Sequence, residues 1–340
     1  MKGLSSCMPA LVVPFANGEV DYECYRGLLE YQKSQGTTHA IVNGTTGESP
    51  ALTDAEQDKL VGLAATQLSV VAGSGSNSTE KALKRSGEAI ALGASALLLM
   101  DPYYNGPSSL EIRKEYYEPV AEKYSCPIIP YVIPGRCGCE LSAYDLAQLA
   151  KDHSNIFSVK EATGNLERMK LTRTLCPDIM IYSGDDDITF RMISDQAIRS
   201  CGVISVAANV FPASVRKMVD LALAGKTEEA SALNAAMSPL FSAITVKSTV
   251  KNPYGFPGEV VQKFRNPLGY KTLMAGLGMM EFGCRRPLGK MDKAGVEFVR
   301  AAARRAWQNN PEILQPLEGA FDVDLSARIE DDANWGMYYG

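Results

Sequence analysis

Eight short runs of mostly apolar residues recur along the first two-thirds of the chain, each followed by a polar or glycine-rich turn and a stretch with helical periodicity. The runs lie at 10–14, 39–43, 69–73, 96–100, 128–132, 157–160, 180–183 and 203–206. Strands that are apolar on both faces are typical of parallel sheets. Eight alternating units predict an α/β fold, a (β/α)8 TIM barrel. A doubly wound open sheet is the main alternative, weakened because no G-x-G-x-x-G follows the first run.

Beyond residue 210 the strand pattern stops and helical patterns follow, at 213–224, 227–242, 268–280 and 290–307. They predict the last barrel helix and a C-terminal helical appendix. We therefore expect a catalytic barrel at 1–225, a helical region at 226–310 and an acidic extension at 311–340. Residues 247–267 contain Asn252-Pro253, Gly255, Pro257-Gly258 and Asn266-Pro267, and these breakers predict an inserted loop.

The extension at 311–340 carries seven acidic residues and one Arg, which gives it a net charge of −6. Long acidic ends are usually solvated. Three aromatic side chains, however, indicate that this end docks on the rest of the protein; they are Trp335, Tyr338 and Tyr339.

Composition excludes several classes of function. The net charge of −5 argues against a nucleic-acid partner, because phosphate binding needs a basic face. No run of about 18 apolar residues could cross a membrane, and Met1-Lys2-Gly3-Leu4 lacks the apolar stretch of a secretory signal. Eight cysteines in so long a chain are expected to be free thiols of a reducing cytoplasm. A zinc site is not expected, because His39 and His153 are the only histidines that could serve as ligands. The sequence predicts a cytoplasmic protein.

Lys160 is the strongest candidate for a catalytic residue. The active site of a (β/α)8 barrel lies at the C-terminal ends of its strands, and Lys160 ends the sixth apolar run. A buried lysine there has a lowered pKa, so its neutral amine can condense with a carbonyl to form a Schiff base. The alternative is a structural lysine that pairs with Glu161 or with an aspartate at a neighbouring strand end.

Hydroxyl groups at other strand ends could move protons for such a lysine. Tyr131 ends the preceding run and can exchange a proton with the imine nitrogen if a relay links it to solvent, and Thr45 and Tyr104 can extend that relay. Thr45, Thr46 and the flanking glycines, Gly44 among them, also present backbone N–H groups suited to a small carboxylate. Each feature alone is weak, because such tyrosines are mostly core residues and such turns mostly only turns.

Six motifs together resemble one family. They are Gly44-Thr45-Thr46-Gly47-Glu48, Pro102-Tyr103-Tyr104-Asn105, Tyr131-x-x-Pro134-x-Arg136-x-Gly138, Val159-Lys160-Glu161-Ala162-Thr163-Gly164-Asn165, Ser183-Gly184-Asp185-Asp186 and Gly202-Val203-Ile204-Ser205. In order and spacing they resemble the dihydrodipicolinate (4-hydroxy-tetrahydrodipicolinate) synthases of the pyruvate-dependent class I aldolases, which include N-acetylneuraminate lyase. The likeness covers residues 5–245 and resumes near Asn266-Pro267.

The resemblance implies a reaction and its catalytic residues. Lys160 would form a Schiff base with pyruvate, which would then condense with L-aspartate 4-semialdehyde, on the route to lysine and diaminopimelate. Tyr131, Thr45 and Tyr104 would form the proton relay, with Tyr104 entering a neighbouring subunit's site. A homo-oligomer, a dimer or a tetramer, is therefore expected. The lysine acts as the electron sink, so the resemblance implies no metal and no organic cofactor.

The resemblance also implies how the substrates are held. Thr46 and the Gly44 turn would bind the pyruvate carboxylate, and Arg136 would bind the carboxylate of the aldehyde at the entrance. Gly184 and the Ile204 carbonyl would line the pocket.

Two other functions stay open. Another pyruvate aldolase, acting on a sialic acid or a 2-keto-3-deoxy sugar acid, would share Lys160 and Tyr131, but Tyr104 and Arg136 favour aspartate semialdehyde over a polyol. The other alternative is a barrel that binds a keto acid without turnover, which an intact set of lysine and hydroxyls makes improbable.

The resemblance finally bears on feedback by lysine. Relatives that lysine inhibits hold it at a dimer interface in a small polar cluster, which this chain retains in part, with Ser49, Asn77 and Tyr103, and changes elsewhere, with Asp54, Gln57 and Lys81. Lys81 stands where sensitive enzymes carry Glu, and its charge repels the ammonium groups of lysine. We therefore expect weak or absent inhibition.

Overall fold

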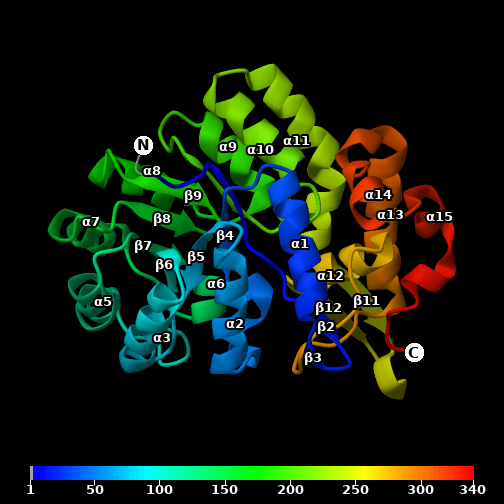
Figure 1. The fold of residues 1–340 in the computed structure, drawn as a ribbon, viewed down its shortest axis with the longest axis horizontal. Helices are drawn as coiled ribbons and strands as arrows, with labels where there is room; N and C mark the ends of the chain where they lie inside the picture. The colour runs from blue at the N-terminus through cyan, green and yellow to red at the C-terminus, as the bar shows by residue number, and fades with distance from the viewer. Residues whose placement is uncertain (1–2) are drawn as a thin grey trace.

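A closed barrel of eight parallel strands forms the centre of the computed structural model, which describes residues 3–340 (Figure 1). The strand order is β1-β10-β9-β8-β7-β6-β5-β4, and a parallel bridge between Ala10 and Ile41 joins the two ends. The strands are β1 (Cys7–Pro9), β4 (His39–Val42), β5 (Ser69–Gly73), β6 (Ala94–Met100), β7 (Ile128–Val132), β8 (Ser158–Glu161), β9 (Met180–Ser183) and β10 (Gly202–Ser205). The predicted (β/α)8 barrel is confirmed.

Helices follow the strands and surround the barrel. The main ones are α1 (Tyr22–Ser34), α2 (Asp54–Ala65), α3 (Thr79–Ala91), α5 (Glu118–Lys123), α7 (Ala143–Asp152), α8 (Leu166–Leu175), α9 (Thr189–Ser194) and α10 (Pro212–Leu223). Between β1 and α1 lies a small hairpin of β2 (Phe15–Ala16) and β3 (Glu19–Val20). The first strand is Cys7–Pro9 and so begins earlier than the predicted run at 10–14. Residues 11–13 are buried beyond the end of the regular strand, and their apolar character makes them resemble a strand in the sequence.

The two faces of each strand belong to two apolar layers. Val132 and Val159 pack in the layer between the sheet and helices such as α1 and α2. Tyr131 packs with Ile41 and Ile204 in the smaller cluster inside the barrel. Because side chains alternate along a strand, Lys160 points to the inside and Glu161 to the outside. Strand pairing places Lys160 directly beside Tyr131.

The C-terminal helices pack on one side of the barrel (Figure 1). They are α11 (Thr227–Phe241), α12 (Leu268–Leu277) and α13 (Lys293–Asn309), and the extension adds α14 (Pro316–Phe321) and α15 (Leu325–Glu330). Trp335 is 1% exposed and fills the space over Gly276, while Arg300 of α13 pairs with Asp332. The extension is therefore packed rather than solvated, although Tyr339 is 61% exposed.

The predicted loop at 247–267 is wrong: most of it is an antiparallel hairpin of β11 (Val246–Lys251) and β12 (Glu259–Phe264). The two strands contain five β-branched residues, a composition typical of strands: Val246, Thr249, Val250, Val260 and Val261. Along β11 exposed side chains alternate with less exposed ones, as in a strand with one face in solvent. All of the breakers except Asn266-Pro267 occupy the turn between the strands, where Asn252, Gly255 and Gly258 have positive φ. Turn-forming residues therefore mark only the seven-residue connection of a hairpin here, not a loop over the whole segment.

No helix among the described residues is long and apolar enough to cross a membrane. All eight cysteines are free, and two of them, Cys7 and Cys137, are buried.

Candidate active site

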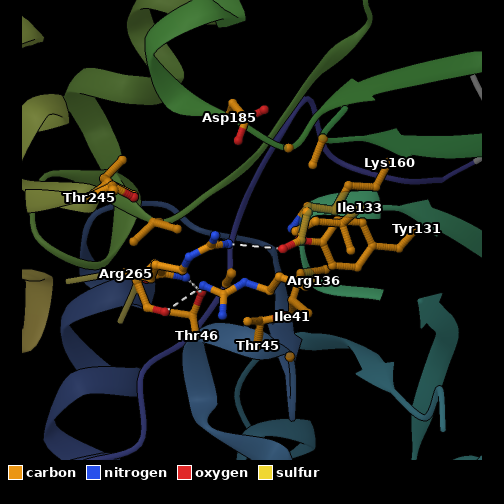
Figure 2. Close-up of a pocket in the computed structure, with 18 of the residues that line it drawn as sticks. Ile41, Thr45, Thr46, Tyr131, Ile133, Arg136, Lys160, Asp185, Thr245 and Arg265 are labelled. Atoms are coloured by element: carbon orange, nitrogen blue, oxygen red, sulfur yellow. Dashed lines mark hydrogen bonds between the residues drawn. The ribbon is translucent and has the colours of Figure 1, made fainter. Parts of the chain in front are cut away.

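A pocket of about 210 Å³ opens at the C-terminal ends of the strands (Figure 2). Lys160 and Tyr131 form its base, and each is only 5% exposed. The Lys160 Nζ lies 4.2 Å from the centre of the Tyr131 ring. The site therefore holds an amine and a phenol in contact within a largely apolar barrel.

Burial lowers the pKa of Lys160 from 10.5 to about 8, while the charges of Asp185 and Asp186 partly oppose this effect. The alternative in which Lys160 pairs with Glu161 does not hold, because Glu161 contacts Arg168 at 3.1 Å. Asp186 accepts hydrogen bonds from the backbone N–H groups of Val206 and Ala207 at 2.9 and 3.3 Å. With a pKa of about 8, about one Lys160 in ten is neutral at pH 7.

Gly184 leaves space for the stem of Lys160. A Cβ at this position would lie 2.7 Å from the Ala162 Cβ, 2.9 Å from the Glu161 carbonyl oxygen and 3.1 Å from the Lys160 Cε. Because these separations are too short for any side chain, residue 184 must be glycine for Lys160 to keep its position.

The turn after β4 lines the other side of the base with Gly44, Thr45 and Thr46. Thr45 and Thr46 begin a short 3-10 helix, and the first N–H groups of a helix have no acceptor within it. The Tyr131 pKa is raised, mainly by burial; Arg136 opposes this effect most, and a hydrogen bond with Thr45 also favours the ionised phenol. The structure thus brings Thr45 to Tyr131, as a relay between them requires.

Arg136 lies at the mouth of the pocket, on α6 (Pro134–Cys137), and Arg265 lies beside it (Figure 2). Arg136 Nη2 donates to the Asn266 carbonyl at 2.8 Å, and Arg265 Nη1 donates to the Gly135 carbonyl at 3.0 Å. Asn266 Nδ2 also donates to the Thr46 hydroxyl at 2.9 Å. These bonds tie the segment after β12 to both the α6 turn and the Thr46 turn.

Asp185 lines the side of the pocket away from the two arginines (Figure 2). Its pKa is raised to about 6, chiefly by burial and then by the charge of Asp187. The carboxyl is therefore mostly ionised at pH 7, and the pocket carries opposite charges on its two sides.

Two predicted site residues do not line the pocket in this chain. Tyr104 is 90% exposed, with a φ of 83°, and is not among the residues that line the pocket. Ile204 is completely buried in the barrel interior.

A buried ion pair supports the turn that carries Thr45 and Thr46. Lys271 of α12 pairs with Glu48, and both side chains are at most 2% exposed. Glu48 also accepts a hydrogen bond from the Arg285 N–H at 2.9 Å. The C-terminal helices thereby fix the turn at the base of the pocket.

A second pocket, of about 330 Å³, collects the residues predicted to form the effector cluster: Ser49, Asp54, Gln57, Asn77, Lys81 and Tyr103. Lys84 and Arg85 also line it, and Lys84 pairs with Asp54 at 3.0 Å. The pocket is therefore richer in basic than in acidic side chains.

Sequence reasoning missed part of the site. Lys263, Arg265 and Asn266 line the pocket from the hairpin side, and none was given a role. Asn266-Pro267 was the available signal, since its resemblance to a family motif placed it near the barrel. No group of three or more His, Cys, Asp or Glu residues within residues 3–340 could hold a metal ion.

Comparison with known proteins assigns the family. The model of the Dihydrodipicolinate synthetase family matches residues 3–306. The 4-hydroxy-tetrahydrodipicolinate synthase of Hydrogenobaculum sp. (strain Y04AAS1) is 36% identical over 272 residues, 78% of this chain and 92% of that protein. The enzyme of the same name from Geotalea daltonii (strain FRC-32) is 39% identical over 76% of this chain and 90% of its own.

A solved structure agrees with this result. The 4-hydroxy-tetrahydrodipicolinate synthase of Methylacidiphilum fumariolicum SolV superposes with a TM-score of 0.81 at 32% identity, covering 94% of this chain and 99% of that one. The chain therefore belongs to the dihydrodipicolinate synthetase family.

Proposed function

We propose that this protein is a lyase of the class I aldolase type that condenses pyruvate with L-aspartate 4-semialdehyde to give 4-hydroxy-tetrahydrodipicolinate. The observation that carries the proposal is Lys160, a buried lysine without an ion pair among the described residues, in contact with Tyr131. The names of the relatives support the choice of reaction. The cytoplasm is the compartment that we infer for it.

The chemistry begins with the neutral amine of Lys160, which attacks the pyruvate carbonyl carbon. The carbinolamine loses water to give an iminium ion, and loss of a proton from the methyl carbon gives an enamine. Tyr131, through Thr45, moves the protons of these steps. The iminium accepts the electron pair that the departing proton leaves, so the proposal needs no metal and no organic cofactor.

The enamine carbon then attacks the aldehyde carbon, forming a carbon–carbon bond and a new hydroxyl group. The amino group of the former semialdehyde attacks the imine carbon, which closes the ring and releases Lys160. The N–H groups at Gly44 and Thr46 are suited to the pyruvate carboxylate. Gly184 leaves room for the Lys160 stem, and we propose that the Ile204 carbonyl also lines the pocket.

The charges of the pocket favour an amino-acid aldehyde over a sugar-derived one. Arg136 and Arg265 provide positive charge on one side, and Asp185 provides negative charge on the other. A substrate with one carboxylate and one ammonium group matches both sides. A neutral polyol chain, as an aldolase for sialic acid or a 2-keto-3-deoxy sugar acid would require, matches neither.

An assay of the purified protein with pyruvate and a panel of aldehydes tests the proposal. L-aspartate 4-semialdehyde should give a higher kcat/KM than N-acetylmannosamine or D-glyceraldehyde. A higher value for either sugar would reassign the substrate, and pyruvate binding without any turnover would identify a keto-acid-binding barrel.

We also propose that Tyr104 completes the relay of a neighbouring subunit, so that the active form is at least a dimer. Its exposure in the single chain supports this, because an exposed tyrosine is free to cross an interface. Mixing Tyr104→Phe with Lys160→Ala subunits should regenerate sites with both residues intact. If subunit exchange is proven and activity does not rise above that of either variant, Tyr104 does not act between subunits.

A further inference from the structure

The β11–β12 hairpin and the segment after it place positively charged side chains at the mouth of the pocket. Lys263 near the end of β12 and Arg265 just after it both line the pocket, as do Ile244 and Thr245 before β11. Arg265 lies at the mouth beside Arg136, although the two residues are far apart in the sequence (Figure 2). The two guanidinium groups therefore belong to different parts of the chain but meet at one entrance.

Hydrogen bonds hold these two arginines in a fixed relation. Each donates one bond to a carbonyl of the other's segment, Arg136 to Asn266 and Arg265 to Gly135. A guanidinium has five N–H donors in a planar fork that matches a carboxylate. Most of the donors on each arginine thus remain for a ligand at the entrance.

The surrounding charges make this entrance strongly positive. Lys263 stands directly opposite Lys247 in the hairpin register, a like-charge pairing that destabilises a hairpin. Within residues 3–340, no carboxylate forms an ion pair with Arg136, Lys247, Lys263 or Arg265. The pKa of Arg136 is lowered, mainly because the surrounding pocket desolvates its guanidinium group and in smaller part by the charge of Arg265. A bound anion would relieve this repulsion.

We propose that Arg265 is a specificity-determining residue that, with Arg136, binds the carboxylate of the acceptor aldehyde, while Lys263 and Lys247 strengthen the positive field around it. The hairpin thereby selects anionic acceptors, with no effect on the binding of pyruvate at the base. The proposal rests on the proposed condensation, since it assigns the acceptor side of the same pocket.

Steady-state kinetics of Arg265→Gln test this role. KM for L-aspartate 4-semialdehyde should rise by about tenfold, because a hydrogen-bonded contact to a charged group is lost, whereas KM for pyruvate should stay unchanged. Arg265→Lys, which keeps the charge, should recover part of the loss. Lys251→Gln is the matched control, because it removes one charge from the same hairpin at a residue that does not line the pocket.

A purely structural role for Arg265 gives a different result. Its bond to Gly135 positions the turn that carries Arg136, so a structural loss would lower kcat as well and would not be rescued by lysine. An unchanged KM for the semialdehyde, or an equal rise in both KM values, overturns the proposal.

Calorimetric titration with succinate separates this inference from the proposed function, because it needs no turnover. Wild-type protein and Lys251→Gln should bind succinate alike, and Arg265→Gln at least fivefold more weakly. If the wild type does not turn over the semialdehyde but binds succinate through Arg265, only the proposed function fails. Equal succinate affinity in all three proteins, or none in the wild type, overturns the role of Arg265.

Discussion

The base and the mouth of the pocket differ in burial and in origin. The base consists of buried strand-end residues, in which Lys160 and Tyr131 are 5% exposed and adjacent in the sheet. The mouth consists of exposed cations from a short helical turn and a hairpin. Burial shifts pKa values and so generates reactive groups, whereas exposed charges are screened and act mainly in recognition. We therefore assign the bond-making chemistry to the residues at the base and the selection of the acceptor aldehyde to the residues at the mouth.

The largest expected effect is at the base. Lys160→Ala should abolish turnover because no nucleophile remains, and Lys160→Arg should do the same, since a guanidinium keeps the charge but is not deprotonated. Product formation from pyruvate and L-aspartate 4-semialdehyde is the measurement, with Lys251→Arg as the control. Substantial activity in either Lys160 variant would place the reactive amine elsewhere.

The buried ion pair between Lys271 and Glu48, which supports the turn at the base, should contribute to the stability of the fold rather than to the choice of acceptor. Lys271→Met leaves the Glu48 carboxylate buried without its partner, which should destabilise the fold by about 3–5 kcal/mol. Urea unfolding of the variant and of the exposed control Lys290→Met gives the comparison. A difference below about 1 kcal/mol would mean that Arg285 alone satisfies Glu48.

At the mouth, Arg136→Ala should separate the two substrates. Loss of a charged contact costs about 1.5–3 kcal/mol, roughly tenfold to a hundredfold in kcat/KM for the semialdehyde. The effect on pyruvate should be smaller, because pyruvate binds at the base. Equal losses for both substrates would show that Arg136 is mainly structural, through its bond to Asn266.

The smallest effect concerns the second pocket, which is also basic. Lys84 and Arg85 line it but are paired with carboxylates, whereas Lys81 has no ion-pair partner within residues 3–340. The charge of Lys81 should therefore repel the ammonium groups of L-lysine there. We expect a dose–response curve with half-inhibition above about 1 mM L-lysine. This concentration corresponds to a favourable binding free energy of less than roughly 4 kcal/mol. Half-inhibition at lower concentrations would contradict this expectation, and Lys81→Glu should strengthen inhibition.

The same division explains what could be predicted from the sequence. The barrel and its base follow from local signals, since alternation along each strand decides which side chains point inward and places Lys160 beside Tyr131. The mouth depends on a contact between Arg136 and a segment 130 positions away, which no local pattern encodes. Arg265 could not be predicted as a site residue, because its position at the mouth depends on the hairpin, whose strands carry no strict alternation of apolar and polar residues.

Borohydride trapping tests the central claim most directly. Protein treated with pyruvate and borohydride should carry one reduced pyruvyl group on Lys160, found by mass spectrometry of a digest. Because burial lowers the Lys160 pKa to about 8, the amine is mostly protonated below that pH, and initial labelling should rise as the pH increases through 8. Label on another lysine, or no label at any pH, would contradict the assignment of Lys160 as the Schiff-base residue.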